Sequence, residues 1–464
     1  MTTPQKYRAI IIGSGQAGTP LSTALGQAGW KTALIEREHV GGTCINEGCT
    51  PTKTMVASGR VAYLAARATD YGVRTGNISI DFGRVRQRKR DVVNSFRNGS
   101  QSRIEETPNV DLVFGEARFN GPNTVEVRQK DGTTRSLTAD TIFINAGTRA
   151  ALPEIEGLRD VPFLNNASIM ELDSVPEHLV ILGGGYIGLE FGQLFRRFGA
   201  RVTIIQSGQQ LLVREDRDIA EEVTKILRQD GVEVLLNAET RRIRGSNGSI
   251  QVELQHQGST RSISGSHLLI AIGRCPNSDT LNLSAAGIQT DKKGFINVNE
   301  RLETNVAGVY ALGDIKGGPA FTHISYDDFR IIRANLLENK SATTRERLVP
   351  YVVFIDPQLG RVGITETEAR AQQRNLRVAK LPMSSVARAI EVDETRGFIK
   401  AIVDAGTNQI LGVSVLGIEG GELMAVFQMA MVGKLPYTAL RDGIFAHPTL
   451  AEALNNLFTA MEKQ

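Results

Sequence analysis

The sequence predicts an α/β protein with two doubly wound βαβ domains and a C-terminal domain of α+β type. An apolar strand, a glycine-rich turn and a helix follow one another twice, first from Tyr7–Ile12 and again from Val180–Leu182. From about Arg347 the pattern changes to short apolar runs, which are typical of an antiparallel sheet. A glycine turn between a buried parallel strand and a helix is typical of a Rossmann-like, dinucleotide-binding domain.

Length and composition agree with a large globular protein. The 464 residues suffice for about three domains. Hydrophobic residues make up 41% and charged residues 22%, which excludes a disordered chain. The formal net charge of +3 is too balanced to indicate a nucleic-acid partner.

The cysteine content and the apolar runs of the sequence predict where the protein is found in the cell. Three cysteines are too few for a disulfide-scaffolded secreted protein. The opening MTTPQKYRAI does not resemble a signal peptide, and no apolar run of about 18 residues predicts a membrane span. We therefore expect a cytoplasmic protein that does not interact with membranes.

The first βαβ unit has the features of a phosphate-binding turn. Strand Tyr7–Ile12 leads into a turn in which Gly13 allows the tight bend. Gly15 allows the backbone to approach a pyrophosphate, and Gly18 allows close packing of helix and strand. The helix N-terminus adds oriented N–H groups. Glu36 ends the second strand, Thr32–Glu36, where it can accept hydrogen bonds from a ribose.

The second unit repeats this pattern with Gly183, Gly185 and Gly188, followed by a helix to about Phe198 and the strand Val202–Ile205. It ends on Gln206, where the first unit has Glu36. A carboxylate there would bind the ribose hydroxyls of NADH and repel the 2′-phosphate of NADPH. Its absence favours NADPH, with NADH as the other option, because no arginine follows directly. The first unit, which keeps its acid, favours FAD.

The remaining apolar runs set the predicted boundaries. Thr141–Ile144 runs into a turn at Gly147, and Val309–Leu312 ends at Gly313 and Asp314. We expect an antiparallel sheet from Val349–Ile355, Ile364, Ile399–Val403 and Ile410–Leu416, then helices at Gly421–Val432 and Leu450–Met461. The predicted division is an FAD-binding domain at residues 1–150 and 274–346, an NAD(P)H-binding domain at 151–273, and a third domain at 347–464.

Two cysteines lie close together in the segment Gly41–Lys53, which reads GGTCINEGCTPTK. On a regular helix their Cα atoms would be roughly 8.6 Å apart, whereas a disulfide needs roughly 4.4–6.8 Å. If Cys44 and Cys49 form a disulfide, the backbone must therefore depart from a regular helix. Such strain makes a disulfide easier to reduce, which suits catalysis. A zinc site is the rival interpretation, but two thiolates without a nearby histidine do not complete it.

This cysteine segment, the two glycine loops and the ending Phe445–Glu452 (FAHPTLAE) resemble the flavin-dependent pyridine nucleotide–disulfide oxidoreductases. That family includes glutathione reductase, dihydrolipoamide dehydrogenase and mercuric reductase, and the resemblance covers essentially the whole chain. The ending LRDGIFAHPTLAEALNNLF is most similar to the reactive-chlorine-resistance flavoprotein subgroup. The resemblance implies a homodimer whose third domain is the dimerisation domain.

The resemblance also implies roles for individual residues. Cys49 would face the flavin and Cys44 the substrate, while Lys53 would lie near flavin N5 and pair with Glu190. His447, oriented by Glu452, would come from the other subunit and move protons. Tyr186 would cover the nicotinamide pocket. The implied cofactor-binding residues are Gly13, Gly15, Gly18, Glu36, Gly42, Thr43, Lys53, Gly147, Gly313 and Asp314, together with Gly183, Gly185, Tyr186, Gly188, Gln206 and Gly273.

The implied chemistry requires these residue types. A hydride passes from the nicotinamide to the flavin, where Lys53 favours the developing negative charge. The electrons open the Cys44–Cys49 disulfide. Cys44 then attacks as a thiolate and needs a base, which His447 can supply because imidazole is the side chain suited to accepting and returning protons at physiological pH. Glu452 would fix the tautomer of the imidazole.

Several acceptors remain open after this resemblance. The first reading is an FAD-dependent NAD(P)H:disulfide oxidoreductase, and the alternative is a copper or mercury reductase, or a quinone reductase, with the same electron path. A flavoprotein that signals its redox state to a partner is the alternative from another class. The absence of a cysteine after Cys275 and the presence of His447 and Glu452 count against mercury. Phe445 and Gln206 replace the histidine and the acid typical of dihydrolipoamide dehydrogenase.

Plainer interpretations remain for some residues. His447 could cap the final helix, Glu190 could lie on the surface, and Tyr186 could serve in packing. Cys275 is expected to be an inert thiol. The basic run Arg84–Arg90 is expected to form a solvated helix face.

Overall fold

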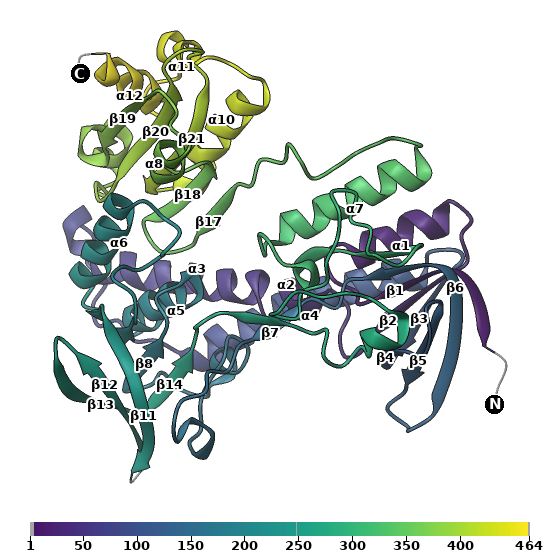
Figure 1. Ribbon diagram of the computed structural model, residues 1–464. Helices are drawn as coiled ribbons and strands as arrows, with labels where there is room; N and C mark the ends of the chain where they lie inside the picture. Colours follow the sequence, from purple (N-terminus) through teal and green to yellow (C-terminus); the bar gives the residue numbers. More distant parts are fainter. Residues whose placement is uncertain (1–3, 247, 463–464) are drawn as a thin grey trace. The chain divides into compact units, whose positions relative to one another are not determined.

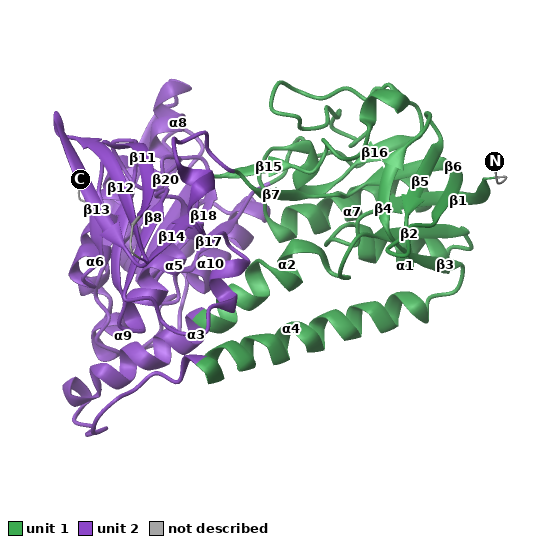
Figure 2. Cartoon of the chain, turned by 90° about the horizontal axis from the view of Figure 1, so that it is seen from below, with its two compact units in different colours: residues 1–55, 83–151, 273–347 green, residues 56–82, 152–272, 348–464 purple. Residues whose placement is uncertain are grey.

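The computed structural model describes residues 4–246 and 248–462. The chain divides into two compact units, each assembled from three segments (Figure 2). Unit 1 consists of residues 1–55, 83–151 and 273–347, and unit 2 of residues 56–82, 152–272 and 348–464. Within the described ranges, no helix is both long enough and apolar enough to cross a membrane.

Unit 1 is built on a seven-stranded sheet (Figure 1). In spatial order its strands are β3 (Val110–Phe114), β2 (Thr32–Glu36), β1 (Gln5–Ile12), β6 (Thr134–Ile144), β5 (Thr124–Arg128) and β4 (Glu116–Phe119), with β16 (Val309–Ala311) beside β6. Strands β1, β2, β3, β6 and β16 pair in parallel, whereas β5 pairs antiparallel with both of its neighbours, β4 and β6. The predicted strands Tyr7–Ile12 and Thr32–Glu36 are confirmed as β1 and β2.

Strand β1 is central because it is apolar on both faces. Ile10 pairs with Ala33 on one side and with Ile142 on the other. Ile10 and Ile12 pack into one hydrophobic cluster, whereas Ala9 and Ile11 pack into the cluster on the opposite face. A sheet covered on both faces is typical of parallel α/β domains, and it brings the carboxyl ends of β1 and β2 to one edge.

The helices that lie wholly or partly in unit 1 carry several of the predicted features. They are α1 (Gly18–Gln27), α2 (Gly42–Asn46), α3 (Cys49–Ala66), α4 (Phe82–Glu105), α7 (Thr322–Leu337), η4 (Leu283–Ala286) and η5 (Gly313–Lys316). The basic run Arg84–Arg90 lies on α4, as predicted for a helix. Lys89 is the exception to the expected solvated face, because it is only 3% exposed.

Unit 2 contains the second parallel sheet. Its strands in spatial order are β10 (Glu233–Leu235), β9 (Arg201–Ile205), β8 (His178–Leu182) and β14 (His267–Ile270). All pairs are parallel, which confirms a second βαβ unit with its own sheet. The helices are α5 (Tyr186–Arg197) and α6 (Arg217–Gln229), with η1 (Ala68–Tyr71), η2 (Leu158–Asp160) and η3 (Ser168–Glu171). A separate antiparallel sheet holds β11 (Ala238–Ser246), β12 (Ser249–His256) and β13 (Ser259–Gly265).

The C-terminal part of unit 2 has the predicted antiparallel sheet. In spatial order its strands are β17 (Tyr351–Val353), β18 (Gln358–Gly363), β21 (Ile410–Gly417), β20 (Phe398–Asp404) and β19 (Leu376–Pro382). The helices are α8 (Glu366–Ala371), α9 (Ala387–Glu391), α10 (Gly420–Val432), α11 (Tyr437–Asp442) and α12 (Ala453–Met461), with η6 (Met383–Ser385). Strand β19 was not predicted, because charged side chains interrupt its apolar residues and only Ala379 and Leu381 are buried.

Candidate functional site

The first glycine loop follows β1 at the point where β1 lies between β2 and β6. In open parallel sheets, ligands bind at this kind of switch point. Gly13 has φ +100°, and a Cβ there would lie 2.4 Å from Asn145 O. A Cβ at Gly18 would lie 2.1 Å from Gly13 O. Both positions therefore require glycine, and the backbone of the loop has the tight shape that the sequence predicts.

Glu36 faces this loop from the end of β2. Its Oε2 accepts hydrogen bonds from the Ser14 backbone N–H at 3.1 Å and from the Ser14 hydroxyl at 2.5 Å. Its Oε1 accepts one from Glu38 N–H at 2.8 Å. A carboxylate offers about four acceptor positions, so it retains capacity for a ribose hydroxyl. The position agrees with the predicted role, which stays a prediction.

Asn145 is a site residue that the sequence reasoning missed. Its Oδ1 accepts the Gly18 N–H at 3.0 Å, and its Nδ2 donates to Leu312 O at 2.9 Å. A Cβ at Gly15 would lie 2.7 Å from Asn145 Oδ1, and one at Gly313 would lie 2.8 Å from Asn145 Nδ2. One buried amide therefore joins the first glycine loop to the Gly313 turn. The signal was a polar residue directly after the apolar run Thr141–Ile144.

Asp314 is the second residue of η5, directly after the Gly313 turn. The Thr148 hydroxyl donates to its Oδ2 at 3.2 Å. Burial raises the pKa of the Asp314 carboxyl, and the nearby Arg274 guanidinium opposes this rise. A half-buried carboxyl that accepts one hydroxyl donor fits a ligand rich in hydroxyl groups, such as the ribityl chain of FAD.

The turn at Gly147 packs against the segment that begins at Gly273. Strands β7 (Thr148–Ala150) and β15 (Arg274–Pro276) pair in an antiparallel manner. Arg274 donates from Nε to the Thr148 hydroxyl at 2.7 Å and from Nη2 to the Thr148 carbonyl at 2.7 Å. The structure thus brings the Gly147 turn next to Asn277, whose N–H donates to Gly147 O at 3.1 Å, and Thr148 next to Asp314. Gly273 lies at the other end of this strand pair, opposite Ala151.

The second glycine loop has the same tight backbone conformation as the first. Gly183 has φ +112°, and a Cβ there would lie 2.3 Å from Ala271 O. A Cβ at Gly188 would lie 2.3 Å from Gly183 O, whereas one at Gly185 would meet no atom within 4 Å. The open side at Gly185 provides room for a dinucleotide to approach the backbone.

Gln206 occupies in the second βαβ unit the position that Glu36 occupies in the first, and it makes the same contact with its glycine loop. Its Oε1 accepts the Gly184 N–H at 2.9 Å, as the carboxylate of Glu36 accepts the Ser14 N–H. The amide therefore keeps the structural contact and removes the negative charge.

The cysteine segment breaks its helix between the two thiols. Helix α2 ends at Asn46 and α3 begins at Cys49, with Glu47 and Gly48 outside both helices. A Cβ at Gly48 would lie 2.9 Å from Thr43 O, so the short connection between α2 and α3 needs glycine at this position. The departure from a regular helix, expected if the cysteines are to meet, is present.

Cys44 and Cys49 are both free thiols in the structure and interact directly. A hydrogen bond with Cys49, together with burial, raises the pKa of the Cys44 thiol. The Thr322 hydroxyl and the Lys53 charge oppose this rise. Thr322 begins α7, and its Oγ1 lies 3.4 Å from Cys49 Sγ. The thiol pair and Thr322 therefore form one cluster.

This cluster adjoins the first glycine loop through the Gly41–Gly42 turn. The Gly41 N–H donates to Ser14 O at 3.1 Å. A Cβ at Gly42 would lie 2.8 Å from Gly15 Cα. The dinucleotide loop and the cysteine segment are thus packed directly on each other, which is the arrangement that a bound FAD would need to exchange electrons with the thiols.

His447 and Glu452 form a pair in the C-terminal domain. His447 Nδ1 lies 2.9 Å from Glu452 Oε2 and 3.1 Å from Glu452 Oε1. Glu452 is the residue before α12, so the alternative in which His447 caps that helix is wrong. The imidazole side chain is 68% exposed and is therefore accessible from outside the chain.

Glu190, Tyr186 and Lys53 lie on two helices. Glu190 on α5 is 3% exposed, and its Oε1 accepts the Phe354 N–H at 2.9 Å. It is thus a buried residue rather than a surface one. Tyr186 is half-buried as the first residue of α5. Lys53 lies one turn after Cys49 on α3, and its pairing with Glu190 stays a prediction.

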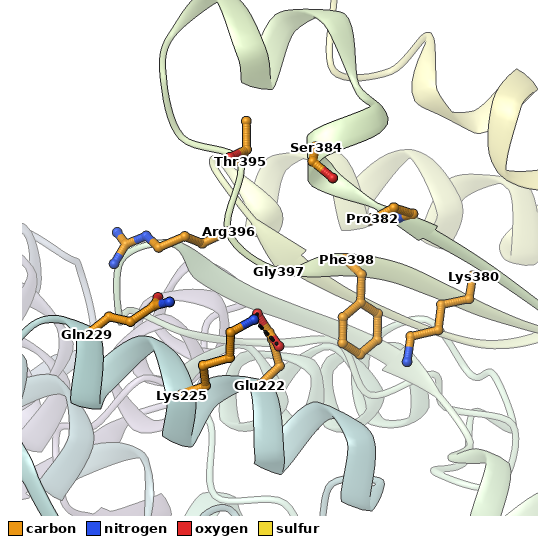
Figure 3. Close-up of a pocket in the computed structure, with 10 residues that line it drawn as sticks. All are labelled: Glu222, Lys225, Gln229, Lys380, Pro382, Ser384, Thr395, Arg396, Gly397 and Phe398. Carbon is orange, nitrogen blue, oxygen red and sulfur yellow. Dashed lines mark hydrogen bonds and ion pairs between the residues drawn. The ribbon is translucent and has the colours of Figure 1, made fainter. Parts of the chain in front are cut away.

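A cavity of about 590 Å³ is lined by residues of α6, of β19 and of the segment that leads into β20 (Figure 3). None of its lining residues is a predicted site residue. Its three cations are already paired with carboxylates, so the cavity does not favour an anion. These pairs are Lys225 with Glu222, Lys380 with Asp218 and Arg396 with Glu394. In the part of the chain that the structure describes, no cluster of three or more His, Cys, Asp or Glu residues could hold a metal ion.

Two family profiles match the sequence. The profile of the pyridine nucleotide-disulphide oxidoreductases covers residues 7–328. The profile of the dimerisation domain of the same family covers residues 349–458.

Individual relatives extend over nearly the whole chain. A "Probable pyridine nucleotide-disulfide oxidoreductase RclA" of Escherichia coli (strain K12) is 41% identical over 98% of this chain and 100% of its own length. A mercuric reductase of Lysinibacillus sphaericus is 34% identical over 97% of this chain and 81% of its own. A dihydrolipoyl dehydrogenase of Geobacillus stearothermophilus is 30% identical over 96% and 93%.

Solved structures agree with the sequence relatives. The Cu(II) complex of the HOCl-induced flavoprotein disulfide reductase RclA from Escherichia coli superposes with a TM-score of 0.90 at 40% identity. The superposition covers 98% of this chain and 99% of the other.

Proposed function

Because this chain belongs to the pyridine nucleotide-disulphide oxidoreductase family, we propose that it reduces a disulfide substrate through the Cys44–Cys49 pair at the expense of NAD(P)H. Enzymes of this family depend on FAD and use NAD(P)H. The observation that carries the proposal is the contact between the two thiols at a helix break that packs on the first glycine loop.

The residues present fit both cofactors. When bound, FAD accepts a hydride from NAD(P)H and passes two electrons to a disulfide. The first glycine loop, Glu36 and Asp314 would hold FAD, and the open backbone at Gly185 would hold the nicotinamide dinucleotide. Because Gln206 removes the charge that repels a 2′-phosphate, we propose NADPH as the preferred donor.

The proton chemistry follows from the state of Cys44. Its raised pKa keeps it a thiol near neutrality, so its attack on a disulfide needs a base. An ionised carboxylate only accepts hydrogen bonds, so Glu452 fixes the proton of His447 on Nδ1 and leaves Nε2 as the base. We propose that His447 from a second copy takes the proton of Cys44.

The thiol–disulfide exchange then needs only Cys44, Cys49 and His447 to account for every bond and proton. The Cys44 thiolate attacks one substrate sulfur, the substrate S–S bond breaks, and the departing thiolate takes the proton from His447. Cys49 next attacks Cys44 and releases the second substrate thiol. The product is a Cys44–Cys49 disulfide, so two electrons have moved to the substrate.

A homodimer is part of the proposal, because the chain contains the family's dimerisation domain. The segment before His447 supports it, since Ile444 is fully exposed and stands three residues before the exposed His447 in the sequence. A second copy would cover this apolar side chain. The domain boundaries at residues 150, 273 and 346 and the cytoplasmic location are also kept as proposals from the sequence.

The direct test measures NADPH oxidation by the FAD-loaded protein with a small disulfide as acceptor. Cys44→Ser should abolish this turnover while NADPH still reduces the flavin in single-turnover absorbance measurements. Cys275→Ser serves as the matched control and should keep wild-type activity. Loss of flavin reduction in Cys44→Ser, or disulfide turnover that survives it, would contradict the proposal.

Reduction of a metal ion is the second candidate, because the superposed relative is described as a Cu(II) complex. Copper(II) takes one electron at a time and leaves no thiolate to protonate. Comparing disulfide and Cu(II) as acceptors in wild type and His447→Ala therefore separates the two. If copper is the better acceptor and the substitution has little effect, the metal-ion reductase is the better description.

A further inference from the structure

Asn46 lies between the two cysteines and closes the short helix that carries Cys44. As the last residue of α2, its side-chain Nδ2 donates to Gly42 O at 2.9 Å and to Val40 O at 3.0 Å. The amide thus ties the end of α2 back to its beginning. The segment from Gly42 to Asn46 is held as one closed turn.

Arg97 holds this amide from a distant part of the sequence. Arg97 lies on α4, and its Nε donates to Asn46 Oδ1 at 2.7 Å. An amide has one acceptor side and one donor side. With the Arg97 cation on the oxygen, the NH₂ group must face the carbonyls of Val40 and Gly42. Arg97 therefore determines which way the amide of Asn46 points.

The closed turn is anchored at its other end on the first glycine loop. The Gly41 N–H donates to both the backbone oxygen and the hydroxyl of Ser14, at 3.1 and 3.2 Å. Gly41 has φ +104° and Gly42 has φ +61°, so this turn has a conformation that other residues rarely adopt. A continuous set of contacts runs from Arg97 through Asn46 to Ser14.

We propose that Arg97, acting through Asn46, is a positioning residue that sets the reduction potential of the Cys44–Cys49 couple. In this couple the disulfide takes up two electrons and two protons and becomes two thiols. A segment already held closed loses little freedom when the disulfide forms, so the oxidised form is favoured. If the segment is loosened, the dithiol gains freedom and the reduction potential rises.

This inference rests on the proposed function, because it requires the two cysteines to cycle between thiol and disulfide. Arg97 differs from its neighbours on α4 in this respect. Arg103 lies on the same helix and is exposed, so its removal takes away an equal charge and leaves Asn46 untouched. Arg103→Met is therefore the matched control.

The experiment equilibrates the FAD-loaded protein with dithiothreitol redox buffers and counts free thiols by alkylation and mass spectrometry. We expect Arg97→Met to shift the dithiol–disulfide equilibrium toward the dithiol by roughly tenfold, which is about 30 mV for a two-electron couple. Arg97→Lys, which keeps a cationic donor, should restore part of the shift. Arg103→Met should leave it unchanged.

A double-mutant cycle separates action through Asn46 from a general loosening of α4. If Arg97 acts through Asn46, Arg97→Met combined with Asn46→Ala shifts the potential no further than Asn46→Ala alone. Additive shifts, or an unchanged potential in a folded Arg97→Met protein, would overturn the proposal. Failure of the proposed function gives a different result, because the Cys44–Cys49 pair of the wild-type protein would then not cycle between disulfide and dithiol when NADPH is supplied.

Discussion

His447 Nδ1 lies 2.9 Å from Glu452 Oε2 at the surface of the C-terminal domain. The two residues are five positions apart, and the backbone between them turns through Pro448 before α12 begins. The carboxylate holds the imidazole in one tautomer while the ring itself stays exposed. An imidazole that is oriented within one chain but exposed to the outside suits the proposed role of a base for the Cys44 thiol of a second copy.

Substitution of His447 by alanine should lower kcat for disulfide reduction by about 100-fold, because general acid–base catalysis typically contributes this much. The measurement is steady-state NADPH oxidation with a small disulfide. His256→Ala, on the hairpin of β12 and β13, is the control. An equal loss of flavin reduction by NADPH in His447→Ala would show damage elsewhere instead.

Replacing Asn145 by alanine should weaken retention of FAD. The change leaves the Gly18 N–H and the Leu312 carbonyl without their partner, at a cost of about 1–3 kcal/mol each. Dialysis followed by flavin absorbance gives the fraction of FAD retained. Asn123→Ala, in an exposed loop, should retain FAD as wild type does. Full retention in Asn145→Ala would show that the amide does not shape the cofactor cradle.

Gln206→Glu should move cofactor preference toward NADH. The new carboxylate can still accept the Gly184 N–H, as Glu36 accepts Ser14 N–H, so the loop should keep its shape. Its charge repels a 2′-phosphate, and a change of about 1.4 kcal/mol alters the ratio of the two kcat/KM values tenfold. Gln210→Glu in the same loop tests whether any added charge suffices, and an unchanged ratio in Gln206→Glu contradicts the assignment.

Asp314→Asn should stabilise the FAD-free protein at neutral pH. Burial raises the pKa of the Asp314 carboxyl above its unfolded value, so ionisation opposes folding. This cost is absent below the unfolded pKa, near 4, and is present once the pH exceeds the raised folded pKa. The Tm advantage of Asp314→Asn over wild type should therefore grow from pH 4 to pH 7. An advantage that is constant with pH would exclude this origin.

Local patterns predicted the elements that are proposed to hold the cofactors. Strand β1 and the first glycine loop were recognised because the isoleucine run and the glycine spacing lie within a dozen residues. Asn145 and Arg97 were missed because their importance depends on contacts with Gly18, Leu312 and Asn46, which are far away in the sequence. No periodicity reveals such contacts.

For strand β19 and Lys89, the local sequence suggested the wrong structure rather than giving no signal. The charged residues of β19 suggest a loop, but pairing with β20 along seven residues makes it a strand. Lys89 belongs to a run that looks solvated, yet it is buried. In both cases the tertiary neighbours decide, and a single sequence does not record them.

The bond from Asn145 to Leu312 spans 167 positions of the chain. A ribosome that adds 5–20 residues per second needs roughly 8–33 seconds to make that stretch. During this interval the nascent chain has the first glycine loop and β6 but lacks β16 and the Gly313 turn. If the Gly313 turn holds the flavin as proposed, flavin capture comes late in synthesis. A product truncated before residue 309 would then lack part of the proposed cofactor site.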